Sequence, residues 1–192
     1  MKRLCFLVIC MSIIMGCSTS TSSTKALVDY VDPNIGTAHC RWFFYTPAAI
    51  PFGMAKLAPS TDAHLGNPGG WQAVGYDFRH TSIEGFANFH EFQVGGVVFA
   101  PTVGELQTVP GELENPDGGY RSRFDKKDEV AAPGYYSVLL KDYGVKAELT
   151  AMKRVGFHRY TYPKTEQANL IFDIGNKQGE SGEVKDAEVQ YF

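Results

Sequence analysis

The segments YYSVLLK (residues 135–141) and VKAELTAM (145–152), joined by the turn DYG (142–144), together predict a β-hairpin. The first segment is rich in the aromatic and β-branched residues that favour strands. In the second, apolar residues at odd positions alternate with mostly polar residues at even positions, which is the period of a strand with one buried face. Gly144 can adopt the positive φ that the turn needs.

Further strand patterns extend from this hairpin on both sides. GFHRYTY (156–162) alternates and stops at Pro163, NLIFDI (169–174) is a further strand, and EVQYF (188–192) begins another. GGVVFAP (95–101) is short and continuously apolar, as in a buried strand. The first half is more irregular: VDPNIG (31–36) predicts a turn, residues 55–58 a strand, and most of residues 113–132 an exposed connection. Many short strands with long loops, and no long helical period, indicate an all-β chain folded as a β-sandwich.

The N-terminus has the features of a secretory signal. MKR (1–3) is basic, residues 4–15 are apolar apart from Ser12, and Gly16 precedes Cys17. The apolar run is too short for a membrane-spanning helix, which needs about 20 residues. IMGC (14–17) resembles the lipobox of bacterial lipoproteins, so we expect lipidation at Cys17; an ordinary signal peptide cut elsewhere is the alternative. We therefore divide the chain into a signal peptide (1–16), a polar tether (17–27) and a β-sandwich domain (28–192).

Composition excludes some functions. The formal net charge is −3, which gives no electrostatic reason to expect a nucleic-acid partner. With Cys5 and Cys10 in the signal and Cys17 lipidated, Cys40 stands alone and no internal disulfide forms. A lone cysteine without an activating pattern is a small buried apolar residue rather than a nucleophile.

Chemistry-bearing residues are spread through the loops of the first half. No His-Glu-x-x-His or Cys-x-x-Cys motif is present, and His158 alternates within a predicted strand, which favours a structural role. Glycosidic cleavage needs two carboxylates across the bond, and the candidates either include such a pair or are solvated or turn-capping groups: Asp62, Asp77, Glu84 and Glu91. Aromatic residues near glycines either stack on a sugar ring or pack in the core: Trp42, Trp71 and Tyr76.

Several motifs occur in an order that resembles glycoside hydrolase family 92. In the first half these are VDPNIGT (31–37), PFGM (51–54), LAP (57–59), GY (75–76), IEGF (83–86) and His90. In the second half they are YRSRF (120–124), EVAAPGYY (129–136), KAELTA (146–151) and RVGFHRYTYP (154–163). The resemblance covers residues 28–192 and is to the N-terminal domain of that family.

The resemblance implies a galactose-mutarotase-like supersandwich packed on a larger (α/α)6 barrel. Family members resemble secreted or surface-anchored bacterial exo-α-mannosidases that invert the anomeric centre and depend on calcium. The barrel supplies the general acid, the general base and most calcium contacts, and the N-terminal domain lends loops that enclose the terminal mannose. The resemblance does not extend to the barrel, so we expect no catalytic residue, no metal ligand and no hydrolysis by this chain alone. We interpret the chain as the front part of a longer protein.

The resemblance also suggests substrate-binding residues. Trp71 would stack on the sugar, His90 and Glu91 would bind hydroxyls or position the barrel, and Gly36 and Gly53 would shape the loops. GFANFHEFQ (85–93) and HCRWFFY (39–45) depart from the usual family pattern, so the sugar specificity stays open. The expected partners are α-mannoside glycans, the C-terminal barrel, and a membrane of the bacterial cell envelope through the lipid. The alternative is a stand-alone, non-catalytic carbohydrate-binding surface lipoprotein.

Overall fold

The computed structural model describes residues 24–38, 45–64, 75–88, 97–176 and 183–190. The chain divides into two units, residues 1–30 and 31–192. The described part of the first unit contains one turn of 3-10 helix, η2 (Leu27–Tyr30). The cationic amine of Lys25 lies 4.5 Å from the centroid of the Tyr30 ring.

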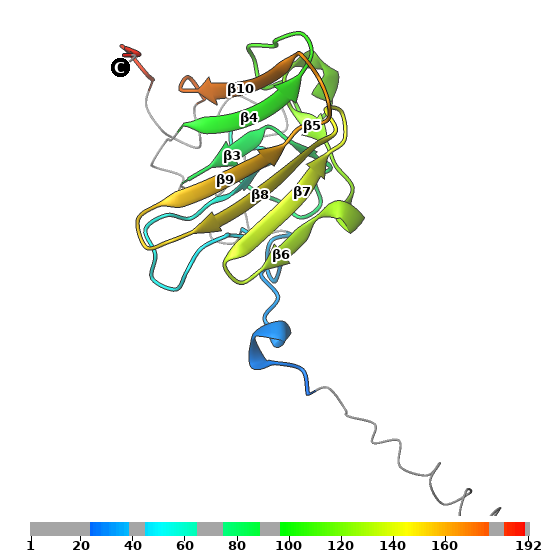
Figure 1. The fold of residues 1–192 in the computed structure, drawn as a ribbon, viewed down its shortest axis with the longest axis vertical. Helices are drawn as coiled ribbons and strands as arrows, with labels where there is room; N and C mark the ends of the chain where they lie inside the picture. The colour runs from blue at the N-terminus through cyan, green and yellow to red at the C-terminus, as the bar shows by residue number, and fades with distance from the viewer. Residues whose placement is uncertain (1–23, 39–44, 65–74, 89–96, 177–182, 191–192) are drawn as a thin grey trace, which may run out of the picture. The chain divides into compact units, whose positions relative to one another are not determined.

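The described part of the second unit is built from short antiparallel strands (Figure 1). Two sheets have four strands each, in the orders β1-β3-β4-β10 and β6-β7-β8-β9, and β2 pairs with β5. Two 3-10 turns, η3 (Pro116–Gly118) and η4 (Lys126–Asp128), join strands. The strands are β1 (Ala58–Ser60), β2 (Ser82–Ile83), β3 (Gly85–Ala87), β4 (Val98–Val103), β5 (Ser122–Arg123), β6 (Val130–Ala132), β7 (Tyr135–Leu140), β8 (Val145–Ala151), β9 (Gly156–Thr161) and β10 (Ala168–Asp173).

The predicted hairpin is confirmed as β7 and β8. Tyr136 pairs with Leu149 and Val138 with Ala147, and Gly144 has a φ of 63° in the turn between the strands. β9 then pairs with β8, so β6 to β9 follow one another in space as they do in sequence. This meander makes one layer of the sandwich, and the fold class predicted from the sequence is confirmed.

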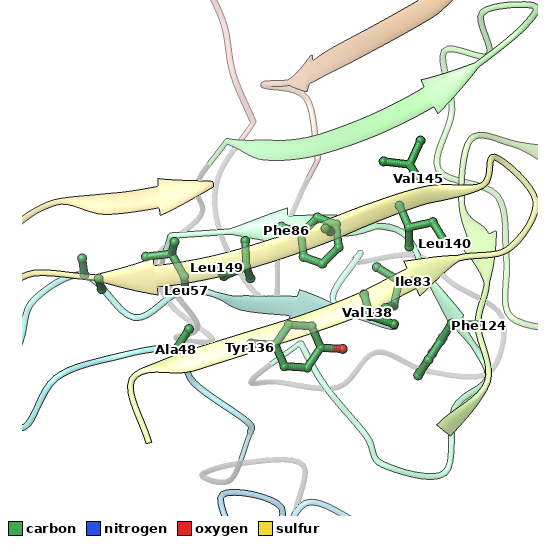
Figure 2. Close-up of a cluster of buried hydrophobic side chains, with 13 residues drawn as sticks. Ala48, Leu57, Ile83, Phe86, Phe124, Tyr136, Val138, Leu140, Val145 and Leu149 are labelled. Carbon is green, nitrogen blue, oxygen red and sulfur yellow. The ribbon is translucent and has the colours of Figure 1, made fainter. Parts of the chain in front are cut away.

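The core lies between the meander and the sheet that contains β3 and β4. Figure 2 shows side chains of β7 and β8 pointing toward Phe86 and Leu57. The Phe86 ring on β3 lies 5.9 Å from the Tyr160 ring on β9, which joins the two layers. Burial of these apolar surfaces is the main favourable term that holds the layers together.

Residues 113–132, predicted to be mostly an exposed connection, contain strands and buried side chains. They contain β5 and the first strand of the meander, and Tyr120, Arg121 and Phe124 are buried. The high charge of this segment suggested solvent exposure, but Arg121 is buried because it meets a carboxylate inside the domain.

Two expected strands also differ from the structure. Residues 55–58 form only an isolated bridge, Ala48 with Leu57, and the strand there begins at Ala58. Residues 183–190 are exposed and have no strand pairing, so the strand expected from Glu188 is absent from its described part; residues 191–192 lie outside the described residues. Residues 55–58 nevertheless run beside β3, because Lys56 N–H donates to the Asn88 carbonyl at 3.0 Å and Ala58 pairs with Ala87.

Candidate functional site

The sequence-predicted site residues fall into two groups. Gly36 and Gly53 are described by the structure, whereas Trp71, His90, Glu91 and the predicted lipidation site Cys17 lie outside the described residues. Over the part of the chain that is described, no helix is long and apolar enough to cross a membrane. The candidate site is therefore built from the loops around Gly36 and Gly53 and from the segment that precedes Trp71.

Gly36 lies in a tight turn that the preceding residues cap. Asp32 Oδ1 accepts a hydrogen bond from the Asn34 N–H at 2.9 Å, and the Thr37 hydroxyl donates to the Asn34 carbonyl at 2.8 Å. Gly36 has a φ of 85°, a conformation that a residue with a Cβ rarely adopts. The turn thus depends on glycine, and it presents Ile35 to solvent.

Gly53 lies on the wall of a mainly apolar hollow of about 650 Å³. A Cβ at this position would lie 3.1 Å from both the Cγ1 atom and the carbonyl oxygen of Ile50, so there is little room for a side chain. The neighbouring Phe52 is fully exposed with a φ of 59°. The hollow is lined by Pro33, Ile35, Tyr45, Pro47, Ala49, Ile50, Phe52, Gly53 and Lys56.

The hollow brings the two predicted glycine loops together. Ile35, next to Gly36, and Gly53 line the same depression, although the two glycines are 17 positions apart in the sequence. Tyr45 provides an aromatic wall and Lys56 a cationic one. Apolar and aromatic walls with few polar groups are typical of small-molecule sites and suit the apolar face of a sugar ring.

A second part of the site is the segment Ser60 to His64, which leads into the residues around Trp71. Glu84, fully buried between β2 and β3, accepts through Oε1 hydrogen bonds from the Ser60 hydroxyl and the Ala63 N–H, both at 2.8 Å. Arg121, also fully buried, donates through Nη2 to the Thr61 carbonyl at 2.7 Å. The Glu84 carboxylate and the Arg121 guanidinium therefore bond to three groups of this segment: the Ser60 hydroxyl, the Thr61 carbonyl and the Ala63 N–H.

Glu84 and Arg121 also form an ion pair, with Nη2 and Oε2 separated by 3.6 Å. Among the described residues, Glu84 Oε2 and the Nε and Nη1 atoms of Arg121 have no hydrogen-bond partner. A buried charge that loses its counter-charge is strongly destabilising. Glu84 is therefore a structural carboxylate rather than a free acid or base.

The other carboxylates also lack the open geometry of an acid–base pair. Asp77 is buried and bonded to Arg79, with Oδ2 and Nη2 2.6 Å apart. Burial acts to raise the pKa of Asp77, but the hydrogen bonds and charge of Arg79 outweigh it and lower the pKa below its ordinary value. Asp62 is buried as well. Asp62, Asp77 and Glu84 are thus buried rather than solvated, and Asp77 and Glu84 are paired with arginines, while Glu91 lies outside the described residues.

A polar cavity of about 480 Å³ opens where the Ser60–His64 segment ends. Asp173, at the end of β10, accepts a hydrogen bond from the buried Tyr120 hydroxyl, and His64 Nδ1 is buried with no partner within the described ranges. Carboxylate, imidazole and amide groups around one cavity suit a hydroxyl-rich ligand. The lining is His64, Thr108, Val109, Pro110, Gly111, Glu112, Asn115, Gly118, Asp173 and Gly175.

Tyr76, one of the three aromatic candidates for sugar stacking, belongs to the core instead. It is buried, and its hydroxyl donates to Glu129 Oε1 at 2.8 Å. Burial, followed by the charge of Glu129, raises the pKa of Tyr76. The Lys126 amine lies 2.8 Å from Glu129 Oε2 and within 5.1 Å of the ring centroid, so the face of the ring is occupied. Trp42 and Trp71 lie outside the described residues.

His158 has the structural role that its strand pattern predicts. Nε2 lies 2.8 Å from Asn88 Oδ1 and Nδ1 lies 2.8 Å from the Tyr160 hydroxyl. The ring contacts Phe99 on the opposite sheet, at a centroid distance of 4.9 Å. Burial lowers the pKa of His158 to about 4, so the ring is neutral at physiological pH.

Little in the sequence points to the Glu84–Arg121 pair. Glu84 is a candidate there only as a loop carboxylate, and Arg121 lies in a segment interpreted as exposed. A charged residue beside aromatic Tyr120 and Phe124 is the one local signal of burial. For metals, the described residues contain no group of three or more His, Cys, Asp or Glu arranged to hold an ion.

Comparison with solved structures first defines the class: the chain resembles part of glycoside hydrolases. The family GH92 alpha-mannosidase BT3965 from Bacteroides thetaiotaomicron is 39% identical with a TM-score of 0.71, over 80% of this chain and 20% of that chain. The structure of the same enzyme in complex with mannoimidazole is 38% identical with a TM-score of 0.71, over 79% of this chain and 20% of that chain. The GH92 family glycosyl hydrolase ccman5 is 28% identical with a TM-score of 0.60, over 78% of this chain and 20% of that chain. The chain therefore spans about a fifth of the length of these relatives.

The family follows from a match to a family model. Residues 30–191 match the Glycosyl hydrolase family 92 N-terminal domain, and the chain belongs to this family. The resemblance found in the sequence motifs is thereby confirmed. No match was found among curated protein sequences.

Proposed function

We propose that this chain is the sugar-enclosing N-terminal domain of a calcium-dependent, inverting exo-α-mannosidase that acts on α-mannosides of glycans. The observation that carries the proposal is the family membership, together with 39% identity to an alpha-mannosidase over 80% of this chain. That relative has also been solved with mannoimidazole bound. The apolar hollow and the polar cavity share no lining residue, so each is a separate candidate surface for a sugar, the first through stacking and the second through hydrogen bonds to hydroxyls.

In this proposal the chain binds and encloses the sugar and does not cleave it. Of the four candidate carboxylates, the three that are described, Asp62, Asp77 and Glu84, are buried, and inverting hydrolysis needs an acid and a base about 6.5–9.5 Å apart with room for water. Among the described residues, no group of three or more His, Cys, Asp or Glu is arranged to hold an ion. As the family resemblance implies, we assign the acid, the base and most calcium contacts to a C-terminal barrel domain, and derive no step through the ion from this chain.

Within the chain, Glu84 and Arg121 would act indirectly. They hold the segment Ser60–His64, which leads directly to the loop of Trp71. Trp71 would stack on the sugar, and His90 and Glu91 would bind its hydroxyls. Gly36 and Gly53 would keep the two loops around the hollow in the conformations described above.

Cys17 would anchor the protein to the bacterial cell envelope through a lipid. The support is the sequence of residues 1–24: a basic start, an apolar run, a lipobox-like motif and a polar tether. Metabolic labelling with a fatty acid should label the protein, and Cys17→Ser should abolish the label. Labelling of the Cys17→Ser variant would exclude this anchor.

The catalytic part of the proposal is tested on the protein as its native cells produce it. Its mature mass should exceed that of 192 residues, and it should release mannose from an α-1,2-mannobioside in a reaction that a calcium chelator stops. Trp71→Ala should lower kcat/KM by about tenfold or more, the loss of roughly 1.4 kcal/mol of stacking, without changing the unfolding midpoint. The control Phe157→Ala removes an exposed aromatic ring from β9 and should leave the kinetics unchanged.

One outcome would contradict the enzyme proposal, and another would contradict the assignment of Trp71 to sugar binding. If the mature protein has the mass of this chain, releases no mannose but binds α-mannosides saturably, the alternative of a non-catalytic carbohydrate-binding surface lipoprotein replaces it. If Trp71→Ala unfolds the domain, Trp71 is a core residue, and the binding assignment fails.

A further inference from the structure

The edge of the sheet at β10 is unusual because it combines an open ladder with exposed apolar side chains. In the sheet order β1-β3-β4-β10, β10 is terminal and pairs only with β4 among the described residues (Figure 1). Leu170 is 40% exposed and Phe172 is 60% exposed. Unprotected edges of this kind attract another strand.

The backbone groups that face the open edge can be identified. The Gly104 N–H donates to the Gln167 carbonyl at 3.0 Å, in the same register that pairs Asn169 with Thr102. Successive residues of an antiparallel strand direct their N–H and C=O groups to opposite sides. The odd-numbered residues of β10 therefore bond to β4, and Ala168, Leu170 and Phe172 direct their backbone groups to the open edge.

The side chains of these same residues lie on the face of the sheet that looks toward the meander. Phe172 pairs with Phe99, and their rings meet edge to face with centroids 5.2 Å apart. Phe99 in turn contacts His158 on β9. The apolar face of the sheet thus continues past β9 onto β10, where Leu170 and Phe172 are left exposed.

The segment that follows β10 has a complementary pattern. Residues 183–190 are EVKDAEVQ, exposed and without a strand pairing, and Val189 is 73% exposed. Ala187 and Val189 would fall on one face of a strand, and Glu188 and Gln190 on the other. Consecutive strands of a chain are usually neighbours in a sheet, and closing a longer loop adds little entropic cost.

We propose that Ala187–Gln190 docks on the open edge of β10 as an additional antiparallel strand. In this register Val189 lies opposite Leu170 and Ala187 lies opposite Phe172, so the apolar side chains share the face of the sheet that is now exposed. Pairing begins at Ala187, because Asp186 would otherwise oppose the carboxylate of Asp173, and like charges directly opposite are destabilising. The occupant is this chain's own segment rather than a second copy.

Amide hydrogen exchange of the full chain tests the pairing residue by residue. The amides of Leu170 and Phe172 should exchange about tenfold or more slowly than in Val189→Pro, because that variant removes the Val189 N–H that bonds to Leu170. Glu188→Pro is the matched control: the Glu188 N–H points away from β10, and proline is tolerated at such edge positions. Equal exchange rates at Leu170 and Phe172 in the wild type and in Val189→Pro would overturn the proposal.

Cross-linking tests the register and the identity of the occupant. Leu170→Cys with Val189→Cys should form a disulfide within one chain, since directly opposite Cα atoms lie about 5.5 Å apart in a bonded pair. Leu170→Cys with Glu188→Cys should not, because the two side chains point to opposite faces. Peptide mapping separates this disulfide from any that involves Cys5, Cys10, Cys17 or Cys40. A disulfide found only between two chains would overturn the proposal in favour of a second copy.

Discussion

The meander β6 to β9 and the loop-rich region from Val31 to Ala87 are held together in different ways. The meander relies on long backbone ladders and on one apolar face per strand. In the loop-rich region the described strands are two or three residues long, and buried side chains make the cross-connections: Glu84 to Ser60 and Ala63, Arg121 to Thr61, and Thr61 to His80 at 2.9 Å.

The difference shows how irregular backbone is kept in place inside a domain. A short strand leaves many backbone groups without ladder partners, and each buried group needs a partner from elsewhere. Charged side chains can satisfy several such groups at once. The candidate sugar-binding loops belong to this polar region, so we expect their geometry to depend on buried charges, whereas the meander depends on packing.

The largest expected effect is at Arg121. Arg121→Met removes the counter-charge of Glu84 and the bond to the Thr61 carbonyl, and leaves a carboxylate buried. We expect a loss of about 3–5 kcal/mol in the free energy of unfolding, measured with urea. The control Lys141→Met breaks an exposed pair with Asp125 and should cost at most about 1 kcal/mol. Equal losses in the two variants would mean that the buried pair does not organise this region.

Leu149→Ala probes the meander by packing alone. Leu149 is buried in the core on β8, and truncation leaves a cavity that should cost about 3 kcal/mol. The control Thr161→Ala changes an exposed residue of β9 and should stay within about 0.5 kcal/mol of wild type. If Leu149→Ala cost less than about 1 kcal/mol, the meander would not depend on this core.

A smaller and pH-dependent effect is expected at His158, which joins the two layers. Its pKa is about 4 in the folded protein against 6.5 when exposed, so the unfolded state binds a proton first as pH falls. Stability should therefore decrease from about pH 6.5 to pH 4, by roughly 1–2 kcal/mol between pH 7 and pH 5.

His158→Gln should flatten this dependence, measured as unfolding midpoints between about pH 4 and pH 7. Some slope should remain, because burial also lowers the pKa of His80, which lies in the loop-rich region. The Thr161→Ala variant serves as the control and should keep the wild-type slope. An unchanged slope in His158→Gln would show that folding does not lower the pKa of the ring.

Local sequence pattern was sufficient to predict the strands of the meander but insufficient to predict the buried polar contacts of the loop-rich region. Alternation over residues 145–151 and Gly144 at the turn predict β7 and β8 because neighbouring strands are also neighbours in sequence. The prediction for residues 113–132 was wrong because the burial of Arg121 depends on Glu84, 37 residues away, and no local pattern encodes such a pairing.

The candidate site was predictable in the same uneven way. Gly36 has the positive φ that its turn sequence implies, and Gly53 lines a hollow with Ile35, but sequence could not show that the two loops meet. For Tyr76 the sequence left sugar stacking and core packing open, and Glu129 and Lys126, more than 45 residues away, hold it in the core. The roles of Trp71, His90 and Glu91 stay predictions.

The exposed turn at Phe52 has a practical consequence for handling the protein. Proteases that cut after aromatic residues prefer exposed turns, and Phe52 presents a whole ring at such a turn. The chain on either side is fastened: Ala48 N–H donates to the Leu57 carbonyl at 2.7 Å, and Met54 N–H donates to the Lys153 carbonyl at 2.7 Å. A single nick at Phe52 would therefore yield two fragments that remain associated, and new chain ends could be introduced there.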